Sequence, residues 1–138
     1  MPRLYREAPI NAIWEGSGNV MALDVLRAAG RQPDAAAAVL QALTEETQGL
    51  PGATEAARAI TAAFRSPEPE AQARLTTDRL ALLAAVAALA RSAPADVAEA
   101  YASTRLATPR RVLGANDLGA VAETLLRRAL DPLTAKLI

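Results

Sequence analysis

The sequence predicts an all-α protein, folded as an antiparallel helical bundle of about six helices. Aromatic residues make up only 3% of the chain, whereas strand-rich proteins use aromatic and β-branched residues heavily. Alanine, the residue with the highest helix propensity, is abundant. Apolar residues also recur three and four positions apart, between short segments that contain proline or glycine. This is the pattern of amphipathic helices joined by short connections.

Three helices are predicted in the first half of the chain, at about 19–30, 33–48 and 53–65. Ser17 or Asn19 is expected to cap the first helix, and Gly30 to end it. Pro33 suits the first turn of the second helix, and the segment 49–52 (Gly-Leu-Pro-Gly) must end it. The residues expected to face inward are Val20, Leu23, Leu26, Val39, Leu40, Leu43, Ala56, Ile60, Ala63 and Phe64.

Three further helices are predicted at about 68–92, 94–106 and 117–130. The segment 66–70 (Ser-Pro-Glu-Pro-Glu) has the capping hydroxyl, prolines and carboxylates typical of a helix start. Between Leu80 and Ala90 no polar face remains, so this stretch is expected to be enclosed by other helices. The last helix carries an apolar stripe that is expected to be core or, alternatively, a subunit interface: Leu118, Val121, Ala122, Leu125 and Ala129.

Composition excludes several classes of site and partner. The 138 residues contain no cysteine and no histidine, which excludes disulfides, zinc–thiolate sites and catalytic triads built on those residues. Fifteen basic residues balance fifteen acidic ones, whereas a dedicated nucleic-acid-binding protein usually has a basic excess. The longest apolar run has eleven residues, and a membrane span needs roughly 20. We therefore expect no membrane partner, no metal, and a cytoplasmic location.

The segment 3–20 (RLYREAPINAIWEGSGNV) combines a carboxylate, two glycines and small polar residues directly before the first long helix. It resembles the last active-site loop of the acyl-CoA dehydrogenase flavoproteins, in the wording of their adaptive-response, AidB-like branch. The resemblance is strongest over residues 3–27 and fades after Leu106. It implies that residues 1–18 are an active-site-type lead-in, and that residues 19–138 are the C-terminal helical domain of such a protein.

The resemblance also implies roles for individual residues. Glu15 corresponds to the base that removes the α-proton of an acyl thioester, a task that requires a carboxylate with a raised pKa. Trp14, Gly16, Ser17 and Asn19 fall at positions expected to contact FAD. The implied partners are acyl-CoA substrates, the N-terminal domains of the family or a chain that supplies them, and other copies in a homo-oligomer.

Other interpretations of the same residues remain open. Without the resemblance, the Glu-Gly-Ser-Gly-Asn turn is an ordinary capping loop, and Trp14 is a large residue in an alanine-rich core. The whole chain could be a non-catalytic helical interaction module. Two arginine pairs, at 110–111 and 127–128, allow a DNA-associated module, because AidB-like proteins are associated with DNA binding through this region. These pairs also suit solvated helix faces.

Overall fold

A computed structural model of the chain describes residues 3, 6–7, 9 and 18–108. The elements in order are α2 (Gly18–Arg31), α3 (Pro33–Glu46), α4 (Ala53–Phe64), the 3₁₀ turn η1 (Pro69–Gln72), α5 (Ala73–Ser92), α6 (Ala95–Tyr101) and the π-helical segment η2 (Ala102–Leu106). No strand occurs among the described residues, so the all-α prediction is confirmed there. The predicted sixth helix, 117–130, lies outside the described residues.

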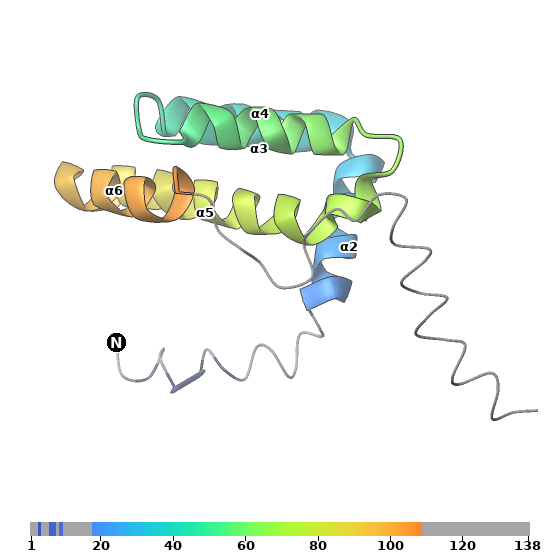
Figure 1. The fold of residues 1–138 in the computed structure, drawn as a ribbon, viewed down its shortest axis with the longest axis horizontal. Coiled ribbons are helices and arrows are strands. Elements are labelled where there is room, and N and C mark those ends of the chain that lie inside the picture. Colours follow the sequence, from blue (N-terminus) through green and yellow to red (C-terminus); the bar gives the residue numbers. More distant parts are fainter. Residues whose placement is uncertain (1–2, 4–5, 8, 10–17, 109–138) are drawn as a thin grey trace, which may run out of the picture.

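The helices are arranged around α5. Helices α3 and α4 lie side by side as an antiparallel pair, and α5 runs lengthwise beneath them (Figure 1). The short α6 and η2 fold back along α5, while α2 lies across one end of the bundle (Figure 1). All the other elements from α2 to η2 pack on α5. The expectation that the stretch 80–90 is enclosed by other helices is only partly right. Leu83, Val86 and Ala87 are buried, whereas four alanines of the stretch are exposed: Ala81, Ala84, Ala88 and Ala90.

The core is built mainly from alanine. Within the described part of the chain, nine of the thirteen buried hydrophobic residues are alanines, and the larger ones are Leu40, Ile60, Leu83 and Val86. Leu40 of α3, Ile60 of α4 and Leu83 of α5 belong to one cluster, which half-buried residues such as Phe64 and Leu80 extend. Small side chains allow close helix packing, but they contribute little apolar area each. The few large core residues therefore carry much of the stabilisation.

Two predictions of inward-facing residues were wrong. Val20 is 50% exposed and Val39 is 55% exposed. Val20 lies in the first turn of α2, which extends beyond the rest of the bundle (Figure 1). In α3 the side that packs inward includes Leu40 and Leu43. Val39 lies next to Leu40 in the sequence, and is therefore turned about 100° away from it around the helix axis.

Three predicted helix boundaries are also corrected. The long helix expected at 68–92 begins as the 3₁₀ turn η1, and α5 starts only at Ala73. The helix expected at 94–106 is α-helical only to Tyr101. Beyond that point Ala107 N–H donates to the carbonyl of Ala102 at 2.9 Å, a five-residue spacing that marks a π-helical turn. The helix expected at 33–48 ends at Glu46.

A buried threonine and two glycines stabilise the turn that connects α3 and α4. Thr47 is fully buried, and its hydroxyl donates to the carbonyl of Leu43 at 2.7 Å. Gly49 and Gly52 have φ angles of 81° and 77°, in the left-handed region that favours glycine. The turn residues in the sequence predicted this break, and the structure shows that both glycines are required by backbone conformation.

Replacing Thr77 by valine should stabilise the protein by about 0.5–1 kcal/mol. The Thr77 Oγ1 atom is buried and has no hydrogen-bond partner among the described residues, so removing it relieves a desolvation cost. The matched control is Thr47→Val, which removes the 2.7 Å bond to Leu43 and should cost about 1 kcal/mol. Urea unfolding of the two variants measures both effects. If Thr77→Val lowered the free energy of unfolding as much as Thr47→Val does, the prediction would be wrong.

Candidate functional site

The predicted site loop precedes helix α2. Trp14, Glu15, Gly16 and Ser17 lie outside the described residues. Asn19 is described, and it is an exposed residue in the first turn of α2. Because α2 begins at Gly18, Asn19 is inside the helix and does not occupy the capping position. The structure therefore leaves Asn19 accessible at the start of α2.

Among the described residues, the first turn of α2 is exposed and carries no acidic side chain. Its described residues Gly18, Asn19 and Val20 are all exposed, and the turn contains no acidic side chain. A Cβ atom placed on Gly18 would meet nothing within 4 Å. The first amides of a helix have no intrahelical acceptor, and the helix dipole favours an anion beside them. Chemically, this end of α2 can accept a phosphate or a carboxylate.

The rest of α2 fixes this end to the bundle. Ala22 is the one fully buried residue of α2 and is 1% exposed, while Leu23, Val25 and Leu26 are half-buried. On the outer side, Arg27 Nη1 and Asp24 Oδ1 form an exposed ion pair at 2.8 Å, which contributes little to stability. The middle of α2, from Ala22 to Leu26, is therefore the anchored part, and the exposed first turn extends beyond the bundle (Figure 1).

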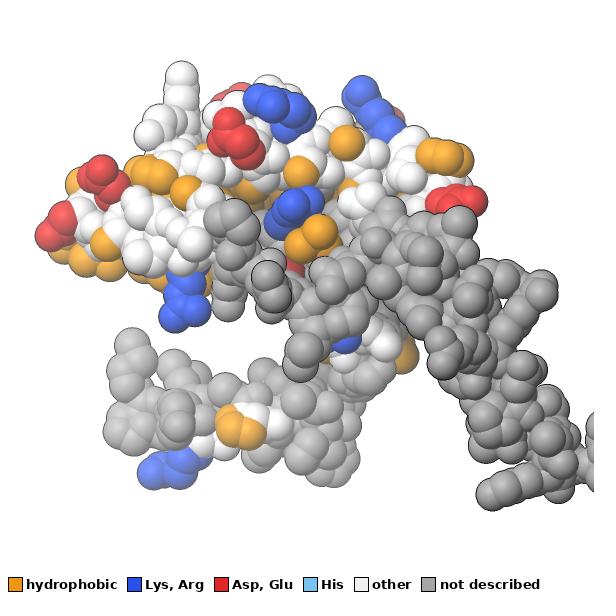
Figure 2. Space-filling model, in the orientation of Figure 1, with side chains coloured by type: hydrophobic (Ala, Val, Ile, Leu, Met, Phe, Trp, Pro, Cys, Tyr) orange, Lys and Arg blue, Asp and Glu red, His pale blue; other side chains and the backbone are white. Residues whose placement is uncertain are grey.

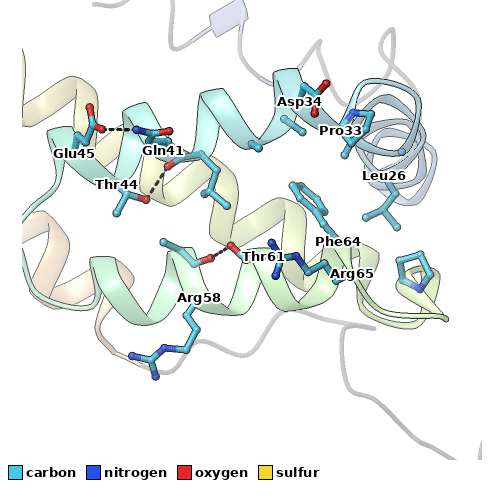
Figure 3. A pocket seen from close by; sticks show the side chains of 17 residues that line it. Leu26, Pro33, Asp34, Gln41, Thr44, Glu45, Arg58, Thr61, Phe64 and Arg65 are labelled. Atoms are coloured by element: carbon cyan, nitrogen blue, oxygen red, sulfur yellow. Dashed lines mark hydrogen bonds between the residues drawn. The ribbon is translucent and has the colours of Figure 1, made fainter.

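A second candidate feature is a groove between α3 and α4, which we call the α3–α4 groove. Its volume is ≈ 1060 Å³, and Leu26 of α2 and Pro69 of η1 close one end. Phe64 points into it from α4, opposite Pro33 of α3 (Figure 3). Sequence analysis missed this groove, because its lining comes from four elements that are brought together only by the fold.

Several polar side chains along the α3–α4 groove already have local partners. Thr44 Oγ1 donates to the carbonyl of Leu40 at 2.7 Å, and Thr61 Oγ1 donates to the carbonyl of Ala57 at 2.9 Å (Figure 3). Gln41 Nε2 donates to Glu45 Oε1 at 2.9 Å. These hydroxyls lack a base, and within the described residues no three acidic side chains gather as metal ligands. The groove is therefore suited to recognition rather than to catalysis.

Charged residues border this groove and are scattered over the same face. Asp34 and Glu45 lie on the α3 side, and Arg58 and Arg65 lie on the α4 side. Figure 2 shows red and blue side chains interspersed on the visible face, with no large area of one sign. The arginine pairs at 110–111 and 127–128 lie outside the described residues. Among the helices of the described part, none has the length and apolar character needed to cross a bilayer.

Comparison with curated proteins gives a match to AidB of Escherichia coli strain K12, an acyl-CoA dehydrogenase-like protein. The identity is 38% over 112 residues, which is 78% of this chain. This chain is related to AidB. The predicted resemblance to the AidB-like acyl-CoA dehydrogenases is thereby confirmed.

The match covers only a small part of the relative. The chain spans 20% of the length of AidB, which is consistent with a C-terminal part of such a protein. No protein-family model matches the chain, and no solved structure matches it. The relationship to AidB thus supports the family, while the roles of single residues follow only from the sequence motif.

Proposed function

We propose that this chain is the C-terminal helical part of an AidB-like FAD flavoprotein and supplies its base, Glu15. The observation that carries the proposal is the 38% identity to AidB over 78% of the chain. The sequence motif around Glu15 lies directly before α2, as the resemblance requires.

The described start of α2 fits a phosphate-bearing cofactor. It is exposed, its first turn has no carboxylate, and the space around Gly18 is open. Its free backbone amides and the Asn19 side chain can hold a pyrophosphate, with Ser17 and Gly16 just before them in the chain. When bound, FAD would supply the acceptor for the hydride that leaves the β-carbon of the substrate.

The residues of the loop have complementary tasks in this proposal. The Glu15 carboxylate takes the α-proton of the acyl thioester, and its backbone N–H donates to the thioester carbonyl as negative charge develops there. Gly16 and Gly18 allow the backbone to come close to the cofactor. Trp14 would line the pocket beside the carboxylate and exclude water from it.

The remaining walls of the site would come from outside this chain. The chain matches one fifth of AidB, so most contacts to FAD and acyl-CoA belong to further domains or to a partner chain. We propose that the helical part also contributes to a homo-oligomer. Alone, the chain should bind FAD weakly and should catalyse nothing.

A chimera tests this function. We expect that AidB of Escherichia coli, with its matching fifth replaced by this chain, retains bound FAD and exchanges the α-proton of an acyl-CoA with solvent deuterium. Glu15→Gln should reduce this exchange at least about 1000-fold, because the amide cannot act as a base, with flavin absorbance unchanged. The control is Glu7→Gln, which removes an exposed carboxylate that pairs with Arg3 at 2.9 Å.

Two results of the chimera experiment would overturn the proposal. A folded chimera without FAD, with helical content retained by circular dichroism, would indicate a non-catalytic helical module. Exchange that survives Glu15→Gln would place the base elsewhere. If the chimera does not fold, titration of the intact chain with FAD gives a separate measurement, and complete absence of a visible-absorbance change at millimolar FAD would also count against the proposal.

A further inference from the structure

Helix α3 is under-packed within the described residues. Only one of its fourteen residues, Leu40, is buried, whereas five of the twelve residues of α4 are buried. A helix of a globular domain normally buries a whole apolar stripe. One exposed side of α3 lines the α3–α4 groove, through Asp34, Ala37, Gln41 and Thr44, so a further element on this groove would add to its packing.

The floor of the α3–α4 groove is apolar. Leu26, Ala36 and Phe64 are half-buried, and Leu40 and Ala57 are buried beneath them. The groove follows α3 from Pro33 to Glu45, which corresponds to a length of about 18 Å. Its shape and chemistry suit an amphipathic helix lying along it.

The same chain contains a segment with matching properties. In residues 117–130 the apolar residues recur at helical spacing from Leu118 to Ala129, which on a helix is a stripe about 16 Å long. This length equals that of the groove to within one turn. The segment contains two acidic and two basic residues: Asp117, Glu123, Arg127 and Arg128. The groove is also bordered by two acidic and two basic residues: Asp34, Glu45, Arg58 and Arg65.

The end of the described chain lies within reach of the groove. A Cβ atom on Gly52 would stand 2.6 Å from the backbone of Ala107, so Ala107 lies against the start of α4. Eight residues, 109–116, then separate Thr108 from the segment, and they can extend over about 27 Å. This reach exceeds the length of the groove.

We propose that residues 117–130 form a helix that docks in the α3–α4 groove of the same chain. A tether of this length gives an effective concentration in the millimolar range, which favours the chain's own segment over a second copy. Docking buries the stripe from Leu118 to Ala129 against Leu26, Leu40 and Phe64. It would also provide the sixth helix of the bundle. This inference concerns packing within the chain and does not depend on FAD.

Thiol protection tests the proposal in the full chain, because the sequence contains no cysteine. Ala37→Cys places a thiol at an exposed position that lines the groove, and Ala81→Cys places one at an exposed position of α5 outside it. We expect the thiol of Ala37→Cys to react with a bulky maleimide at least tenfold more slowly than that of Ala81→Cys. Adding Leu125→Asp, which puts a charge on the stripe, should remove the difference.

Cross-linking identifies the occupant. Ala37→Cys combined with Ala122→Cys should give an intramolecular product with a short bismaleimide, whereas Ala81→Cys with Ala122→Cys should not. Equal maleimide rates at Ala37→Cys and Ala81→Cys would overturn the proposal. Covalent dimers as the main product, or protection that grows with protein concentration, would also overturn it, because they would show that a second copy fills the groove.

Discussion

Leu83→Ala should destabilise the protein by about 2–5 kcal/mol, the largest loss expected from any single truncation in this core. Leu83 is fully buried in α5 and belongs to the cluster that joins α3, α4 and α5. Truncating Leu83 would remove its contacts with this cluster, whose other large buried members are Leu40 and Ile60, and would leave a cavity that a close-packed core fills only in part. Since the free energy of unfolding of a small domain is only about 5–15 kcal/mol in total, the variant should be close to unfolded at 37 °C.

The matched control is Leu82→Ala. It makes the same chemical change one position away in the same helix, at a residue that is only half-buried. Its loss should be less than half that of Leu83→Ala, because less apolar area leaves a buried environment. Urea unfolding monitored by circular dichroism measures both. Similar losses for the two variants would mean that Leu83 is not at the centre of the core.

Gly52→Ala should be the most damaging substitution in a turn. Gly52 has a φ angle of 77°, which costs an L-residue about 1 kcal/mol or more. In addition, the new methyl carbon would lie 2.6 Å from both the Cα and N atoms of Ala107. Backbone atoms cannot rotate away as a side chain can, so the end of η2 must shift. The total loss should reach about 3 kcal/mol.

Gly49→Ala separates the two causes. Gly49 has nearly the same φ angle, 81°, but a Cβ atom there would meet nothing within 4 Å. Gly49→Ala should therefore lower the free energy of unfolding only by the conformational term, about 1 kcal/mol. Amide chemical shifts of Leu106 and Thr108 should change in Gly52→Ala and stay unchanged in Gly49→Ala. Equal unfolding free energies for the two variants would show that the approach of Ala107 to Gly52 is unimportant.

Local sequence patterns predicted most elements but not the details of their packing. The proline and glycine positions located the breaks near residues 32, 49–52 and 93–94, because these residues limit the backbone wherever they occur. The change from α to π geometry after Tyr101 was missed. The π-helical segment ends against the start of α4, at Gly52, and no local propensity contains that contact.

The motif around Glu15 was recognised from sequence, and the match to AidB confirms the resemblance to the AidB-like acyl-CoA dehydrogenases. Asn19 illustrates the limit of such reasoning: its residue type suits a helix cap, but the structure places it inside the first turn of α2. The α3–α4 groove has no sequence signature at all. Its lining includes Leu26, Leu40, Phe64 and Pro69, which come from four elements.

By itself, the sequence determined that this protein is helical, where its helices break, and which family it resembles. These properties depend on backbone propensities and on a contiguous motif, both of which are local in the chain. Only the tertiary structure decided that Leu40 packs inward while Val39 remains exposed, that Leu83 lies at the centre, and that α3 and α4 enclose an open groove. In an alanine-rich chain many helix faces are similarly apolar, so the buried face is selected by contacts between distant helices rather than by the period of any one of them.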